Sequence, residues 1–245
     1  MKTRPVLSQG PAVFVTTLED RERNAPMSIA TGMKMYNSQL SPYAARCRIA
    51  IYAKDLDVEL VEMPDPAAEE EFSRQAPMHK VPLLVDGDVV VPESGTICEY
   101  LEDRGLGLSL RPSDPAAMAL MRTLGRICDL YVMEPMNELF GQINPADRDQ
   151  AVVTREMALL VKAMSWLDHY VEGPAYAVGG ALSLADCMLA PTLFFFDRIG
   201  PMFGEAAPLR QFPTASDYYK AICGDAAVAK VMAELDISLR RMMGS

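Results

Sequence analysis

The segment VPLLVDGDVVV, residues 81–91, constrains the fold more than any other part of this sequence. Two runs of aliphatic residues meet at Asp86-Gly87, a pair that is typical of the tight turn in a β-hairpin. The segment therefore predicts two antiparallel strands. Pro82 stands where the first strand opens, a position that tolerates a residue without an N–H donor.

Around this hairpin, residues 33–103 alternate between short strand-like and helical patterns. MKMYN and VELVEM predict strands, PYAARCRIAIYAKD predicts the helix between them, and AAEEEFSRQ predicts a short acidic helix. After the hairpin, SGTICEYLEDRG predicts a helix capped by Ser94 and closed near Gly105. The order is βαβ followed by ββα, and we assign this α/β domain to residues 33–107.

Beyond RPSDP the pattern is helical throughout, so we assign a linker to residues 108–114 and an all-helical domain to residues 115–245. Pro115 is expected to open a long helix that ends near Ile143. A second helix covers roughly residues 146–172. SLADCMLAPTLFFF predicts a third, with Ser183 as the N-cap, Asp186 completing a capping box and Leu182 as a hydrophobic staple. The fold class is α/β plus all-α.

Charge and cysteine content exclude several classes of protein. The chain has 23 basic and 33 acidic residues, a formal charge of -10, so a nucleic-acid partner is not expected. Its five cysteines are odd in number and widely spaced within apolar segments, which indicates buried free thiols rather than disulfides or a zinc site.

The apolar segments of the chain indicate where in the cell the protein is expected. The run MLAPTLFFF is too short to span a membrane, and prolines, a glycine and polar residues interrupt the first residues before any apolar core of a signal peptide develops. We therefore expect a cytoplasmic protein with no membrane partner. Residues 1–32 are expected to form a poorly ordered extension, with Met27 and Met33 as candidate starts of the folded part.

Common catalytic motifs are missing from the sequence. With two histidines and no GxSxG motif, a serine-histidine-acid triad is not indicated, and neither a metal site nor a glycine-rich phosphate loop can be recognised. What remains is a set of three stretches in the α/β domain that are expected to meet at one end of the sheet.

Each of these stretches has a structural and a functional interpretation. Val81-Pro82 is either a simple strand-entry proline, which the local pattern favours, or a cis bond that leaves the Val81 backbone free to pair with an extended ligand. Glu93 and Ser94 either cap a helix or hold the amine and carboxylate of a ligand at its N-terminus. Ser41, followed by Pro42, either caps the next helix or also acts on a ligand atom.

Three longer segments together resemble glutathione transferases. SPYAARCRIAIYAKDLDVELV resembles the first helix and second strand of the family, APMHKVPLLVDGDVVVPESGTICEYLED its glutathione-binding half, and GGALSLADCMLAPTLF the capping box and helix of its helical domain. The resemblance implies an N-terminal thioredoxin-like domain. Within the superfamily the chain looks like the omega and tau groups and their bacterial relatives, with serine at position 41 where omega members carry cysteine. Because Ala44 follows instead of a second cysteine, mixed-disulfide chemistry is disfavoured.

The resemblance implies a homodimeric detoxification enzyme that uses glutathione as co-substrate, binds no metal, and conjugates it to a small hydrophobic electrophile. It assigns the following residues: Ser41 to stabilisation of the glutathione thiolate, Lys80, Val81, Pro82, Glu93 and Ser94 to glutathione binding, and Tyr43 and Tyr131 to the electrophile pocket. Two alternatives remain open. One is thiolytic cleavage of a β-aryl ether, because bacterial etherases of the superfamily have similar ES…CEYLED segments. The other is a non-catalytic ligand-binding or interaction module.

Overall fold

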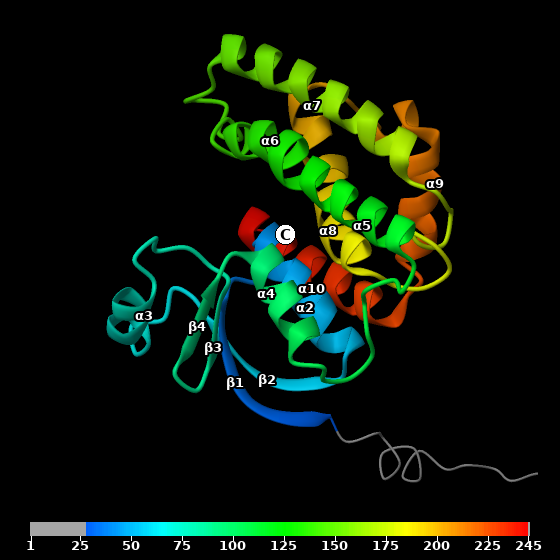
Figure 1. Cartoon of the computed structure of the whole chain (residues 1–245). Coiled ribbons are helices and arrows are strands. Elements are labelled where there is room, and N and C mark those ends of the chain that lie inside the picture. The colour runs from blue at the N-terminus through cyan, green and yellow to red at the C-terminus, as the bar shows by residue number, and fades with distance from the viewer. Residues whose placement is uncertain (1–27, 245) are drawn as a thin grey trace, which may run out of the picture.

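The computed structural model describes residues 28–244, which form an α/β domain followed by a helical domain (Figure 1). The expected extension falls mostly outside this range, since residues 1–27 are not described. Its expected boundary at residue 32 is too late, because the first strand begins at Ile29 and pairs with the strand that follows in sequence. The folded domain therefore starts before Met33.

The α/β domain is built on a four-stranded mixed sheet with the order β2-β1-β3-β4. Its strands are β1 (Ile29–Asn37), β2 (Leu56–Glu62), β3 (Leu83–Asp86) and β4 (Val89–Pro92). β1 runs parallel to β2 and antiparallel to β3, and β3 pairs with β4 through the predicted hairpin. Gly87 in the turn has φ +59°, a left-handed conformation that glycine adopts without strain.

Alternate residues of the strands enter different cores, as the two-residue period of a strand requires. Met35 and Leu84 belong to the large core with helices α2 (Pro42–Ala53) and α4 (Ser94–Asp103). Tyr36 and Leu83 belong to a small cluster with Phe72 of α3 (Glu69–Gln75). Figure 1 shows α2 and α4 between the sheet and the helical domain, and α3 beside the sheet, away from the helical domain. The site-bearing helices thus face the second domain.

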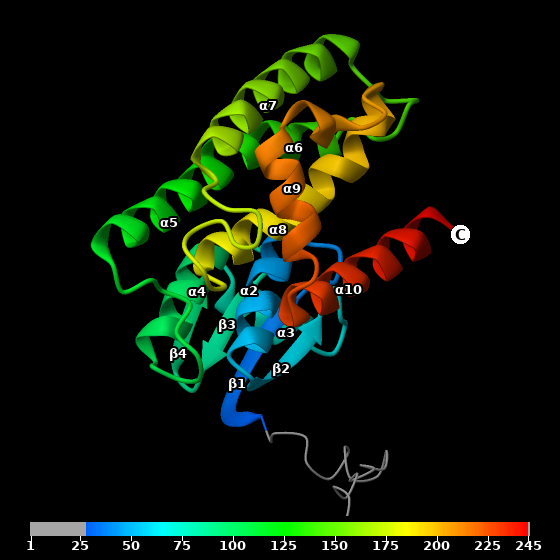
Figure 2. The same ribbon diagram turned by 90° about the vertical axis from the view of Figure 1, so that its right-hand side faces the viewer.

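The helical domain contains no strand among its described residues. Its helices are α5 (Pro115–Ile127), a π-helical turn η1 (Cys128–Val132), α6 (Met133–Phe140), α7 (Gln150–Tyr170), α8 (Leu184–Ile199), α9 (Pro213–Ile222) and α10 (Ala226–Met243), with short 3₁₀ turns at Gly200–Phe203 and Pro208–Gln211. α8 and α10 both pack on α2, and Figure 2 shows α10 returning to the α/β domain. The large hydrophobic core therefore runs continuously through both domains.

The capping box at the start of α8 is confirmed. The N–H of Ser183 donates to Oδ2 of Asp186 at 2.8 Å, and the N–H of Ala177 and the hydroxyl of Tyr218 donate to Oδ1. Asp186 is completely buried, so these donors replace the water that its carboxylate loses on folding. This cap fixes where α8, the helix packed on α2, begins.

The expected long helix from Pro115 is interrupted by η1. A π-helical turn holds more residues per turn than an α-helix, so the side chains after it face a different direction from the one that α-helical spacing predicts. The helix also ends at Phe140, before Ile143. This local change decides which side chains of the helical domain reach the neighbouring domain.

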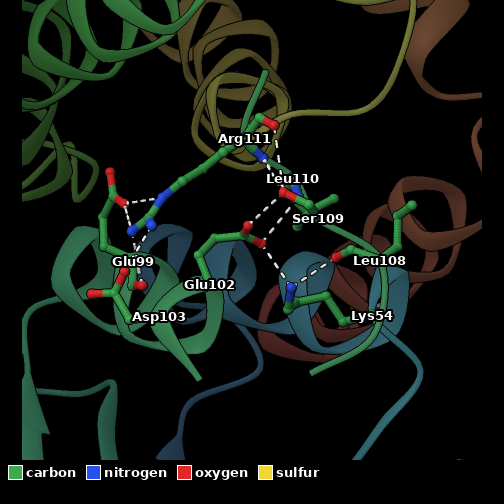
Figure 3. Close-up of polar contacts among 8 residues, drawn as sticks. All are labelled: Lys54, Glu99, Glu102, Asp103, Leu108, Ser109, Leu110 and Arg111. Carbon is green, nitrogen blue, oxygen red and sulfur yellow. Dashed lines mark hydrogen bonds and ion pairs between the residues drawn. The ribbon is translucent and has the colours of Figure 1, made fainter. Parts of the chain in front are cut away.

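A buried ion pair attaches the interdomain linker to the α/β domain (Figure 3). Nζ of Lys54, at the end of α2, donates to Oε1 of Glu102 on α4 and to the carbonyl of Leu108, each at 2.7 Å. Glu102 also accepts from the hydroxyl of Ser109 and the N–H of Leu110. Lys54 and Glu102 are at most 9% exposed. One ion pair therefore joins two helices and the linker.

We predict that Glu102→Gln lowers the free energy of unfolding by about 3 kcal/mol near neutral pH, because it leaves a buried ammonium group without its counter-charge. Burial raises the pKa of Glu102, but the hydrogen bonds from Lys54, Leu110 and Ser109 outweigh it and hold the pKa below its ordinary value. The stabilisation is therefore complete above the unfolded pKa of about 4.3 and is lost as the pH falls through the lower pKa of the folded state.

Urea unfolding of the parent and of Glu102→Gln between about pH 7 and pH 3 measures the difference in their free energies of unfolding. The matched control is Glu99→Gln, which removes a partly exposed partner of Arg111 and should cost less than about 1 kcal/mol. A Glu102→Gln cost that is no larger than that of the control, or that does not shrink in acid, would contradict the assignment.

Candidate functional site

A cavity of about 660 Å³ lies between the two domains. This volume is within the range of ~300–1,000 Å³ that is common for small-molecule sites. The α/β domain contributes Tyr43, Met78, Lys80, Val81, Pro82, Pro92, Glu93, Ser94 and Gly95 to its wall, and the helical domain contributes Arg126, Asp129, Leu130 and Asn137. Six of the predicted site residues thus share one wall: Tyr43, Lys80, Val81, Pro82, Glu93 and Ser94.

The loop before β3 forms one part of this wall. The Val81–Pro82 peptide bond is cis, which is the geometry that the local pattern did not favour. Pairing of the Val81 backbone with a ligand stays a prediction. The ladder between β1 and β3 begins only at Leu83, which leaves Val81 outside the sheet. His79, just before Lys80, has φ +48°, a left-handed conformation that is uncommon for a residue with a side chain. A backbone that is not used by the sheet therefore lines the cavity.

The turn into α4 forms a second part. Ser94 is the first residue of the helix rather than its cap, which corrects our expectation. The N-cap position belongs to Glu93, whose carbonyl accepts from the N–H of Ile97 at 2.8 Å and whose side chain makes no capping hydrogen bond. Glu93 has φ +70°, which is strained for this residue, and it lines the cavity. The first N–H groups of α4 therefore have no capping side chain.

Ser41 caps α2, as predicted, and its oxygen accepts from the N–H of Ala44 at 3.2 Å. It is partly exposed and is not itself among the residues that line the cavity, whereas Tyr43, two residues later, is. The buried side chain of Arg48 supports the turn before Ser41, because it donates to the carbonyls of Ser38 and Gln39 at 3.2 and 3.0 Å. The start of α2 is thus fixed beside the cavity from inside the protein.

Two direct polar contacts join α2 to the helical domain beside the cavity. The guanidinium of Arg46, fully buried, forms an ion pair with Asp129 of η1. Nδ2 of Asn137 donates to the hydroxyl of Tyr43 at 2.8 Å. Burial raises the pKa of Tyr43, so its phenol is neutral near pH 7. These contacts set the distance between the two walls.

Tyr131 does not line this cavity, which corrects our expectation. It lies in a separate groove, where its ring packs edge-on against Trp166 of α7 with centroids 5.2 Å apart. The π-helical turn is the physical reason, since Tyr131 lies within it and its side chain does not take the direction that α-helical spacing predicts. Its neighbour Leu130 reaches both the cavity and the groove.

Sequence reasoning missed the wall that the helical domain supplies. Arg126 and Asp129 are charged residues within the expected long helix, and both line the cavity. Asn137 carried no signal at all. Cys47, by contrast, agrees with the general expectation of buried free thiols. It is completely buried on α2, and burial raises the pKa of its thiol, so it has the features of a packing residue.

No cluster of possible metal ligands occurs among residues 28–244, and no helix in that range is long and apolar enough to cross a membrane. The polar groups of the cavity wall are the N-terminus of α4, a loop backbone outside the sheet, the acidic residues Glu93 and Asp129, and the basic residues Lys80 and Arg126.

The chain is similar in sequence to known proteins in both domains. Models of the glutathione S-transferase N-terminal and C-terminal domains match residues 35–105 and 150–221. Glutathione S-transferase 1 of Dianthus caryophyllus is 30% identical over 188 residues, which cover 74% of this chain and 82% of the relative. Maleylacetoacetate isomerase of Rattus norvegicus is 30% identical over 200 residues, which cover 77% of this chain and 86% of the relative.

The fold is also that of solved structures. A glutathione S-transferase of Methylobacillus flagellatus KT, solved with GSH bound, matches with a TM-score of 0.69 at 23% identity, covering 82% of this chain and 98% of the other. The similarity therefore extends over both domains and confirms the expected architecture of a thioredoxin-like domain followed by a helical one.

Proposed function

This chain belongs to the glutathione S-transferase family, and we propose that it activates the thiol of glutathione for attack on a hydrophobic electrophile. The observation that carries the proposal is that the loop of residues 80–82 and the turn of residues 93–94 line one cavity. The solved relative with GSH bound supports glutathione as the co-substrate. A relative named as an isomerase has the same level of identity, so the reaction performed on the electrophile is part of the proposal and not of the family assignment.

Each polar part of glutathione has a chemical counterpart on this wall. A carboxylate is favoured at the uncapped N-terminus of α4, where N–H groups and the helix dipole are directed at it. The ammonium group suits the carboxylate of Glu93. The backbone of Val81 can pair with the peptide part as an added strand, and Lys80 can attract the second carboxylate. The two carboxylates and the amine thus each meet a group of opposite polarity.

We predict that glutathione affinity depends more on Glu93 than on Lys80. Both side chains are exposed at the cavity, but Glu93 is held in a strained backbone position at the N-terminus of α4, whereas Lys80 lies in the loop before β3. Calorimetric titration of Glu93→Ala and Lys80→Ala with glutathione compares the two. Both variants should retain the thermal unfolding midpoint of the parent. A larger loss of affinity in Lys80→Ala would contradict this order.

Ser41 is proposed to stabilise the thiolate rather than to act as a nucleophile. A free thiol has a pKa of about 8.5, and lowering it by about two units requires ~2.7 kcal/mol of selective stabilisation of the thiolate. A hydroxyl has one donor and two acceptor sites. Because the hydrogen bond from Ala44 uses an acceptor site, the hydroxyl hydrogen of Ser41 is free to donate to sulfur while the helix cap is kept.

We predict that Ser41→Ala raises the pKa of bound glutathione by one to two units and lowers turnover at neutral pH by roughly ten- to a hundredfold. Ultraviolet absorbance of the bound thiolate, followed against pH, measures the shift. Loss of the cap by itself should cost about 1 kcal/mol of stability and leave the titration unchanged. A variant that loses only stability would show that Ser41 is a helix cap and nothing more.

A non-catalytic module would bind glutathione without using it. Glutathione-agarose binding followed by assays with a panel of electrophiles, including aryl halides, unsaturated carbonyl compounds and β-aryl ethers, separates the two classes. Turnover of at least one electrophile supports the enzyme, whereas retention on the resin without turnover of any of them supports the module.

The chain is further proposed to form a homodimer. The groove that contains Tyr131, of about 410 Å³, is lined by large exposed apolar side chains. These are Leu130, Tyr131, Leu159 and Trp166. Apolar residues gathered on one face are typical of protein interfaces.

We predict that Trp166→Glu shifts the protein from dimer toward monomer, because it places a charge in that contact. Sedimentation velocity over a range of concentrations measures the change, with Met242→Glu, an exposed substitution on α10, as the control. A parent protein that sediments at 26.9 kDa at all concentrations would contradict the dimer.

A further inference from the structure

Arg126 is a cationic side chain in the cavity wall that has no counter-charge in the protein. It lies at the end of α5, is exposed, and lines the cavity. Within residues 28–244 its guanidinium forms no ion pair or hydrogen bond. An arginine in this position is available to a ligand.

The lack of a partner has a structural cause. Asp129, three residues further along the chain, also lines the cavity and is the acidic residue nearest to Arg126 in sequence. Here the carboxylate of Asp129 is bound instead to Arg46, which reaches it from α2 in the other domain and is fully buried. Arg46 needs that carboxylate because a buried guanidinium without a counter-charge is costly. The interdomain ion pair therefore leaves Arg126 unpaired.

The charges of the cavity wall lead to the same conclusion. Its charged side chains are Lys80, Glu93, Arg126 and Asp129. With glutathione bound as proposed, Lys80 and Glu93 face its carboxylate and ammonium groups, and Asp129 is neutralised by Arg46. Arg126 is the remaining charge, and it comes from the helical domain.

We propose that the electrophile of this enzyme carries a carboxylate, which Arg126 binds while the apolar part of the molecule lies against the cavity wall near Leu130. This inference rests on the proposed glutathione site and adds the substrate class to it. A guanidinium presents parallel N–H donors that match a carboxylate in a bidentate geometry. Leu130 lines the same cavity and supplies an apolar surface there.

Binding of glutathione conjugates tests the inference without requiring turnover. The probes are S-(carboxybenzyl)glutathione and S-(carbamoylbenzyl)glutathione, substituted at the 3- or 4-position of the ring, which differ in charge but hardly in shape. Calorimetry gives their Kd values for the parent, for Arg126→Gln, and for Arg122→Gln. Arg122 is a matched control because it is an exposed arginine one turn earlier on α5 that does not line the cavity.

We expect at least one carboxy conjugate to bind the parent about tenfold more tightly than its carbamoyl partner, as a charge-assisted hydrogen bond would produce. In Arg126→Gln this ratio should fall to about one while the affinity for glutathione itself is unchanged. In Arg122→Gln the ratio should be that of the parent.

Other outcomes would overturn the inference. Equal affinities for the two conjugates in the parent would show that no carboxylate is recognised. If Arg126→Gln weakens glutathione as much as the carboxy conjugate, Arg126 contacts glutathione and not the electrophile. If neither glutathione nor any conjugate binds the parent, the glutathione site itself is wrong and the inference falls with it, a result distinct from the first two.

Discussion

The burial of helix α2 by both domains is the constraint on which the rest of the structure depends. One side of the helix packs on α4 and the sheet, and other sides pack on α8 and α10 of the helical domain. Two of its buried cations tie it to neighbouring elements: Arg46 pairs with Asp129 of η1, and Lys54, at its C-cap, pairs with Glu102 of α4. The position of Ser41 relative to the helical domain is therefore set by packing and charge rather than by the linker.

Those elements that local chemistry specifies could be predicted from the sequence. The hairpin at Gly87, the cap at Ser41 and the capping box at Ser183 all follow from short segments whose residues meet their own hydrogen-bonding and backbone requirements. Cavity-lining residues of the α/β domain could also be predicted, because they belong to the loops and helix starts of the same segments.

The helical-domain wall could not be predicted, because it depends on interactions between distant residues. No local sequence pattern marks η1. A prediction that assumes a continuous α-helix therefore points the side chain of Tyr131 in the wrong direction and cannot place that of Asp129. The pairing of Arg46 with Asp129 joins residues far apart in the chain. Ser94 was misplaced by one position, since the left-handed conformation of Glu93 is imposed by the turn and not by its own preference.

The central claim is that this protein lowers the pKa of the glutathione thiol, and proton release on binding measures it most directly. Calorimetry near pH 7.5 in two buffers of different ionisation enthalpy, with S-methylglutathione as the thiol-free control, gives the number of protons released. If the pKa falls from about 8.5 to about 6.5, about 0.8 proton should be released by glutathione beyond that released by the control. Equal release by the two ligands would contradict the account.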